Sequence, residues 1–196
     1  LDSTSLLGIA RGLREEHRFE SGRKITFAPR VLLGAAENPN VSPVEHRAVR
    51  LAKKIAAGAQ FVQTQYCYDI PLLRRFMTAV EDAGLLEQVF ILIGVGPIRT
   101  AKAGEWMRTH VPGIHIPDSV IERMKGAKDQ TREGLNLCVD LIQEVRTIKG
   151  VSGVHVMAYR QEEAVAEVID RSGILAGRTP WFPGRDPQIN EDRKLS

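Results

Sequence analysis

The sequence contains little cysteine and no long apolar run. Of its 196 residues only Cys67 and Cys138 are cysteines, and they lie far apart without a CxxC spacing. This excludes a disulfide scaffold and a zinc ribbon and is typical of a reducing compartment. No apolar run approaches the ~20 residues that a membrane span needs, and we recognise no signal peptide. The sequence therefore predicts a cytoplasmic protein that does not bind a membrane.

A strong excess of one charge is also missing. The chain has 27 Lys and Arg against 24 Asp and Glu, a net charge of +3. This surplus is small and spread along the chain, so nucleic acid is not predicted as a partner. The five histidines are scattered without carboxylates at ligand spacing, and no Gly-x-Ser-x-Gly motif occurs. We therefore predict neither a metal site nor a serine hydrolase.

Four short apolar runs rich in Val, Ile, Phe and Tyr predict strands. They are Val31–Ala36, Phe61–Tyr68, Val89–Gly96 and Gly153–Tyr159. The run from Val89 to Ile93 is apolar at every position, which predicts a strand covered on both faces, as in parallel sheets.

Between these runs, apolar residues recur at helical spacing. The patterns predict helices at Leu6–Glu16, Glu45–Ala57, Pro71–Ala83, Thr100–His110, Pro117–Lys125, Gln130–Thr147 and Glu162–Arg171. Ser3 or Thr4 is the expected N-cap of the first helix. Alternating strands and helices predict an α/β fold with adjacent parallel strands, either a barrel or a doubly wound sheet. Four strands are too few for an eight-stranded barrel, so we expect residues 1–175 to be its second half. Residues 176–196 are expected to form an extended or disordered tail.

Two predicted strands place polar groups on one face. Alternation puts Gln63 and Gln65 on one side of the second strand, and His155, Met157 and Tyr159 on one side of the fourth. Buried amides cost free energy unless they find hydrogen-bond partners. Gln65 lies toward the carboxyl end of its strand, where barrel enzymes place their chemistry. The pattern predicts either a functional site or polar groups that are satisfied within the core.

The helix predicted at Glu45–Ala57 carries four cations opposite its apolar stripe, namely Arg47, Arg50, Lys53 and Lys54. This is either a solvated helix face or a cationic edge for a phosphate-bearing cofactor. No phosphate-binding GxxxxGK[ST] loop occurs. Gly94-Val95-Gly96 lacks the third glycine of a dinucleotide motif. We expect these two glycines to permit close approach of backbone and to leave room for a flat ligand.

One stretch of the sequence resembles the methylenetetrahydrofolate reductase family. It is Ala57-Gly58-Ala59-Gln60-Phe61-Val62-Gln63-Thr64-Gln65-Tyr66-Cys67-Tyr68-Asp69. In that family an Ala-Gly-Ala turn leads into a strand ending Thr-Gln-aromatic-x-aromatic-Asp. Three further segments resemble the family in the same order, namely Gly34–Pro39, Gly94–Ile98 and Val154–Tyr159. The likeness covers residues 1 to about 175.

The resemblance implies a (βα)8 TIM-type barrel, to which this chain contributes strands five to eight. It implies FAD as cofactor and NAD(P)H as hydride donor. The implied reaction is the reduction of 5,10-methylenetetrahydrofolate to 5-methyltetrahydrofolate in one-carbon and methionine metabolism. The implied partners are the folate substrate and the N-terminal half of the barrel, in the same or a separate chain. Assembly into a homo-oligomer is left open.

By matched position, the resemblance gives roles to individual residues. Gln65 is similar to the catalytic glutamine that contacts flavin and folate, and Tyr159 falls at a second folate-binding position. The FAD-binding positions implied by the resemblance are Arg47, Arg50, Lys53, Lys54, Gln65 and Met157.

Several positions depart from the family pattern. Ala101 stands where a stacking phenylalanine is usual, Met157 replaces a tyrosine, Tyr159 replaces an aliphatic residue and Glu37 stands where tyrosine is common. The acidic catalytic residue of the first barrel strand belongs to the other half, so this chain is expected to be incomplete and inactive by itself. An exposed sheet edge is expected at Val31–Ala36. Two alternatives stay open: a flavin-free folate-dependent one-carbon transferase, and a non-catalytic half-barrel subunit of a larger complex.

Overall fold

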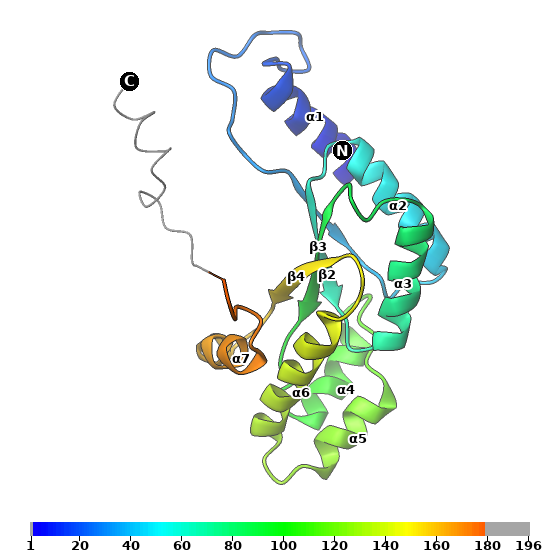
Figure 1. Ribbon diagram of the computed structural model, residues 1–196, viewed down its shortest axis with the longest axis vertical. Helices are drawn as coiled ribbons and strands as arrows, with labels where there is room; N and C mark the ends of the chain where they lie inside the picture. The colour runs from blue at the N-terminus through cyan, green and yellow to red at the C-terminus, as the bar shows by residue number, and fades with distance from the viewer. Residues whose placement is uncertain (1, 179–196) are drawn as a thin grey trace.

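Four parallel strands form one sheet whose strand order follows the order of the chain. The computed structural model describes residues 2–178, with strands β1 (Gly34–Glu37), β2 (Phe61–Tyr66), β3 (Phe90–Val95) and β4 (Val151–Val156) (Figure 1). Every neighbouring pair is parallel. The α/β class and the adjacent parallel strands predicted from the alternating pattern are therefore confirmed. β1 lies at one edge of the sheet, as expected for the segment around Val31–Ala36.

The helices lie close to their predicted positions. They are α1 (Ser3–Glu15), α2 (Val44–Ala56), α3 (Ile70–Asp82), α4 (Ala101–His110), α5 (Asp118–Gly126), α6 (Gln130–Val145) and α7 (Val165–Ser172), with a 3-10 turn at Glu162–Ala164 before α7. The expected cap of α1 was wrong. Asp2 is the cap, because Ser3 already lies inside the helix and the Asp2 carboxylate accepts a hydrogen bond from the Ser5 N–H at 2.8 Å. No helix within residues 2–178 combines the length and apolar character needed to cross a membrane.

Within residues 2–178, helices cover one face of the sheet and not the other. Val62, Ile91 and Ile93 are fully buried on the covered face, in a core shared with α2, α3 and α6. Figure 1 shows α2 and α3 along one side of the strands, and α4, α5 and α6 gathered at the lower end of the molecule. On the other face Phe90 is 68% exposed and Leu92 is only partly buried. The prediction that this strand is covered on both faces is therefore wrong for the described residues, because they supply helices to one side only.

Two glycines let the carboxyl ends of the strands approach closely, as the sequence predicts. A Cβ on Gly94 would stand 2.4 Å from the Thr64 carbonyl oxygen, and one on Gly96 would stand 2.1 Å from the Met157 carbonyl oxygen. The Met157 methyl group and the Tyr66 ring also lie against these glycines. Neighbouring backbone and side chains therefore fill the space beside the two glycines. The room for a flat ligand that we expected there is not present.

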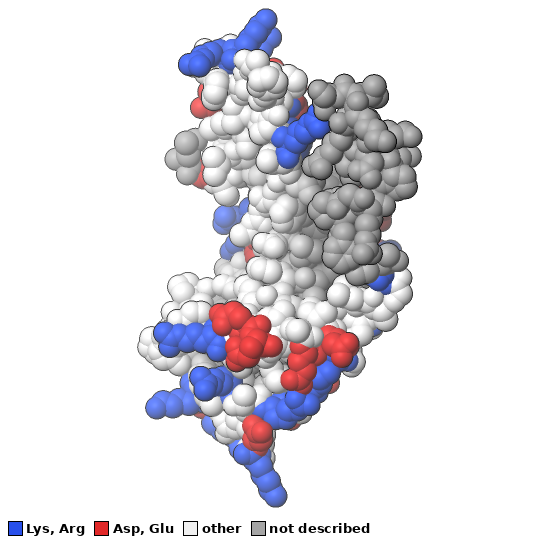
Figure 2. Space-filling view, turned by 90° about the vertical axis from the view of Figure 1, so that its left-hand side faces the viewer, with Lys and Arg blue, Asp and Glu red and all other residues white. Residues whose placement is uncertain are grey.

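Charged side chains of both signs meet on the helices at the lower end of the molecule (Figure 2). Arg123 pairs with Asp140 at 2.8 Å, and Lys125 pairs with Glu105 at 2.9 Å. Exposed pairs of this kind typically contribute less than about 1 kcal/mol each. The packing of α4, α5 and α6 therefore depends mainly on the apolar core.

The two cysteines lie in that core, and they make stability sensitive to alkaline pH. Burial raises the pKa of the Cys67 and Cys138 thiols to about 12, from an ordinary value of 9.0. Burial also raises the pKa of Tyr68. The thiols of the unfolded chain ionise at lower pH than those of the folded chain. The free energy of unfolding is therefore highest below pH 9 and falls as the pH rises from 9 toward 12.

Urea unfolding at several pH values on either side of pH 9 measures this loss. The double variant Cys67→Ala, Cys138→Ala should lose less stability over the same pH range, leaving the smaller contribution of the tyrosines. An equally steep decline in that variant would contradict the role of the thiols.

Candidate functional site

A cavity of about 410 Å³ opens on the uncovered face of the sheet, at the carboxyl ends of the strands. We call it the carboxyl-end cavity. It is lined by Ala36, Glu37, Asn38, Arg47, Arg50, Lys54, Gln63, Thr64, Gln65, His155 and Met157. In α/β sheets ligands bind outside the carboxyl ends of the strands. Of the seven residues given a site role from the sequence, five are brought together here, namely Arg47, Arg50, Lys54, Gln65 and Met157.

Helix α2 supplies the cationic wall of this cavity. Arg47, Arg50 and Lys54 follow one another at helical spacing and share one face, which borders the stripe buried around Leu51. Lys53 does not line the cavity and its side chain is exposed. Consecutive residues of a helix are about 100° apart, since a turn takes 3.6 residues. That spacing alone separates Lys53 from its neighbour Lys54.

Strand β2 supplies two amides. Val62 and Thr64 point into the core, so alternation turns Gln63 and Gln65 to the open face, as predicted. The Gln65 side-chain oxygen accepts a hydrogen bond from the Tyr66 N–H at 3.0 Å. Its amide nitrogen lies 3.5 Å from the Pro112 carbonyl oxygen, at the limit of a hydrogen bond. The Gln65 amide nitrogen is therefore only loosely held and can turn to a ligand.

Strand β4 supplies His155, and Met157 directly follows the strand, but Tyr159 does not join them in the cavity. The His155 Nδ1 atom is buried and has no hydrogen-bond partner within the described residues. Tyr159 is 74% exposed, outside the cavity lining, and the Arg160 guanidinium lies 5.2 Å from its ring centroid. Sequence alternation had grouped Tyr159 with the other two, but β4 ends at Val156 and regular alternation ends with it.

The loop that follows β1 closes over the ends of β1 and β2, and no role was predicted for its asparagines from the sequence. The Asn38 and Asn40 amides each donate to the Gly113 carbonyl at 3.0 Å, and Asn40 also donates to the Tyr66 carbonyl at 2.8 Å. His115 Nε2 lies 3.1 Å from an Asp69 carboxylate oxygen. Asn38 and Asn40 directly follow a strand, which is the signal that could have drawn attention to them.

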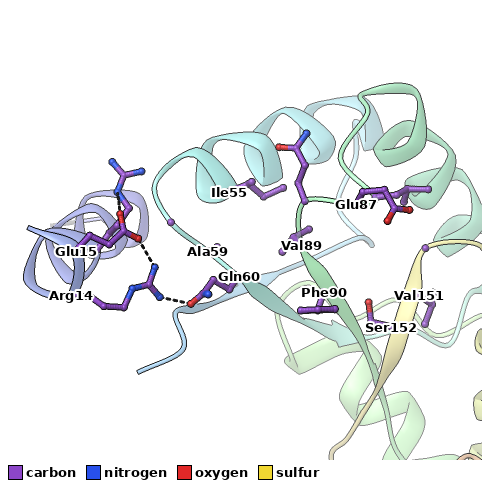
Figure 3. A pocket seen from close by; sticks show the side chains of 15 residues that line it. Arg14, Glu15, Ile55, Ala59, Gln60, Glu87, Val89, Phe90, Val151 and Ser152 are labelled. Atoms are coloured by element: carbon purple, nitrogen blue, oxygen red, sulfur yellow. Dashed lines mark hydrogen bonds and ion pairs between the residues drawn. The ribbon is translucent and has the colours of Figure 1, made fainter. Parts of the chain in front are cut away.

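A second and larger cavity lies at the opposite end of the sheet. It measures about 640 Å³ and is bordered by the first residues of β3 and β4, Phe90 and Val151 (Figure 3). Arg14 reaches into it from α1, but Arg14 already donates to the Gln60 side chain and to Glu15. Since Arg14 is already paired and this cavity lies at the amino ends of the strands, we take the carboxyl-end cavity as the candidate site.

The residues of the carboxyl-end cavity suit a flat cofactor that bears phosphates. Guanidinium groups bind phosphate oxygens bidentately, and neutral amides both donate and accept hydrogen bonds to a heteroaromatic ring. The buried Nδ1 of His155 offers a further polar atom without a protein partner. Within residues 2–178, no three His, Cys, Asp or Glu side chains are grouped as they would need to be to hold a metal ion.

Comparison with known proteins finds methylenetetrahydrofolate reductases among the relatives of this chain. The chain is 28% identical over 136 residues to methylenetetrahydrofolate reductase 2 of Schizosaccharomyces pombe, covering 65% of this chain and 21% of the relative. It is 29% identical over 162 residues to methylenetetrahydrofolate reductase 2 of Saccharomyces cerevisiae, covering 78% of this chain and 26% of the relative. The chain thus spans about a quarter of the length of these curated relatives.

A solved structure supports the fold. An uncharacterized protein from Clostridium thermocellum, which binds two copies of 5-methyl-5,6,7,8-tetrahydrofolic acid, superposes with a TM-score of 0.57 at 18% identity. The match covers 76% of this chain and 54% of that protein. The model of the methylenetetrahydrofolate reductase family matches residues 24–173, well over half of the sequence. The chain therefore belongs to the methylenetetrahydrofolate reductase family.

Proposed function

We propose that this chain is the second half of a (βα)8 barrel that reduces 5,10-methylenetetrahydrofolate to 5-methyltetrahydrofolate with FAD and NAD(P)H. The observation that carries the proposal is the carboxyl-end cavity, where Arg47, Arg50, Gln65 and Met157 meet on one side of a parallel sheet. Family membership supports the same reaction.

The open sheet face supports a missing half-barrel. Phe90 and Leu92 are apolar side chains of a central strand, and yet no helix or strand of the described residues covers them. Burying such side chains contributes about 1.5–3 kcal/mol each. The N-terminal half of the barrel, in the same or a separate chain, is the partner that would bury them and add strands to the free edges of β1 and β4.

Each wall of the cavity then has a role in the reaction. Arg47 and Arg50 would hold the FAD phosphates, Met157 would pack on the flavin, and Gln65 would contact both the flavin and the folate. A neutral amide can donate to one ring and accept from the other without adding charge. The flavin, when bound, supplies the hydride chemistry, while these residues orient the two rings and exclude water.

The test is to express this chain together with its missing half. We expect a yellow protein that binds FAD and oxidises NADH with menadione as acceptor, whereas the isolated chain should be inactive. A reconstituted protein that binds no flavin would contradict the proposal.

A flavin-free folate-dependent one-carbon transferase is the second candidate. The ion pair between Lys54 and Glu37 favours it, because this pair takes one cation away from the cofactor phosphates. Folate binding without flavin in the reconstituted protein would decide for this alternative. A non-catalytic half-barrel subunit would show neither NADH oxidation nor folate binding.

A further inference from the structure

Glu37 and Lys54 form an ion pair in the wall of the carboxyl-end cavity. The Lys54 Nζ atom lies 2.7 Å from a Glu37 carboxylate oxygen and donates to the Ala36 carbonyl at 2.5 Å. The other Glu37 oxygen accepts from the Asn38 N–H at 2.9 Å. The Lys54 side chain is 8% exposed and the Glu37 side chain is 1% exposed. The pair therefore ties α2 to the carboxyl end of β1.

Such a pair leaves Lys54 little capacity to bind an anion. The two charges cancel at short range, so a phosphate in the cavity meets almost no net field from them. Moving Lys54 onto a phosphate would also leave the Glu37 carboxylate buried without its partner, which is costly. The same carboxylate would then repel the phosphate.

By contrast, the two arginines on the same helix face keep nitrogen atoms available to bind an anion. Arg47 donates through Nε to the Val41 carbonyl at 3.1 Å, which leaves its terminal nitrogens for other acceptors. Arg50 is exposed on the cavity side, and no carboxylate that the structure describes lies within ion-pair distance of it. A guanidinium can bind a phosphate through two parallel hydrogen bonds.

We infer that Glu37 is a specificity-determining residue of this cavity: it holds Lys54 in the wall, so that the phosphates of the ligand are bound by Arg47 and Arg50 alone. This inference rests on the proposed function for the identity of the ligand. Lys54 is then a structural residue, although its position matches a cofactor-binding position of the family.

The experiment measures FAD affinity by flavin fluorescence in the reconstituted protein, for three variants. Arg50→Gln should weaken FAD binding about tenfold, since it removes a charge-assisted hydrogen bond. The neutral double variant E37Q/K54M should keep the FAD affinity within about twofold, because it removes two charges that cancel. Glu37→Gln alone should strengthen FAD binding several-fold, since it frees Lys54. Riboflavin, which lacks phosphates, is the matched probe and should bind all three variants alike.

The double variant avoids a lone buried charge, and thermal unfolding shows whether each variant folds. If E37Q/K54M loses FAD as strongly as Arg50→Gln, Lys54 is a phosphate ligand and the inference is wrong. The same titrations with inorganic pyrophosphate separate the inference from the proposed function. Pyrophosphate binding that follows the expected order, without FAD binding, would overturn the flavin assignment and keep the inference. Binding of neither probe would overturn the assignment of Arg47 and Arg50 as the anion site.

Discussion

Replacing Gln65 with alanine is expected to lower turnover of the reconstituted protein about 10²-fold, the usual effect of removing one positioned hydrogen-bond group at a reacting centre. The Gln65 amide nitrogen lies in the carboxyl-end cavity, loosely held by the Pro112 carbonyl at 3.5 Å. Its loss should remove contacts to the flavin and the pterin while the sheet stays intact, because Gln65 lies on the open face. Steady-state kinetics with a folate substrate, together with thermal unfolding, measure both effects.

Gln143→Ala is the matched control for this prediction. Gln143 is exposed on α6, away from the cavity, so the same chemical change there should leave turnover and stability unchanged. A structural role for Gln65 predicts the opposite behaviour, with lowered stability and unchanged turnover in the folded fraction. Normal turnover of Gln65→Ala would therefore remove Gln65 from the catalytic residues.

Replacing Gly134 with alanine is expected to destabilise the protein strongly. A Cβ at this position in α6 would stand 1.9 Å from the carbonyl oxygen of Ile98, which is backbone and cannot rotate away. Relieving this overlap requires α6 to move from the loop that follows β3. Overpacking of this kind costs about 3 kcal/mol, which for a chain of this size corresponds to a fall in melting temperature of about 10 °C.

Gly8→Ala is the control for this substitution. Gly8 also lies within a helix, α1, but nothing stands within 4 Å of the added Cβ. Alanine should therefore raise the free energy of unfolding by about 0.5–1 kcal/mol through its higher helix propensity. Differential scanning calorimetry of the two variants shows whether each substitution raises or lowers the melting temperature. A melting temperature for Gly134→Ala equal to that of Gly8→Ala would mean that α6 is not held against Ile98.

Local pattern was sufficient to predict the elements of this chain. The apolar stripe of α2 and the buried alternation of β2 each follow from residues that are close in sequence. Alternation also placed Gln63 and Gln65 on one face. It failed at Tyr159, because the residue lies beyond the end of β4, and at Phe90, because an apolar residue carries no information about which elements will cover it.

The order of strands and helices, the faces they present and the grouping of Arg47 with Arg50 were determined by the sequence itself, since each depends on a fixed helical or strand period. Only the tertiary structure decided which charges meet. Glu37 and Lys54 belong to different elements, and their 2.7 Å contact arises because α2 packs beside the end of β1. The loop fastened by Asn38 and Asn40 has the same origin. Such contacts join residues distant in sequence, so they depend on packing geometry that no local pattern encodes.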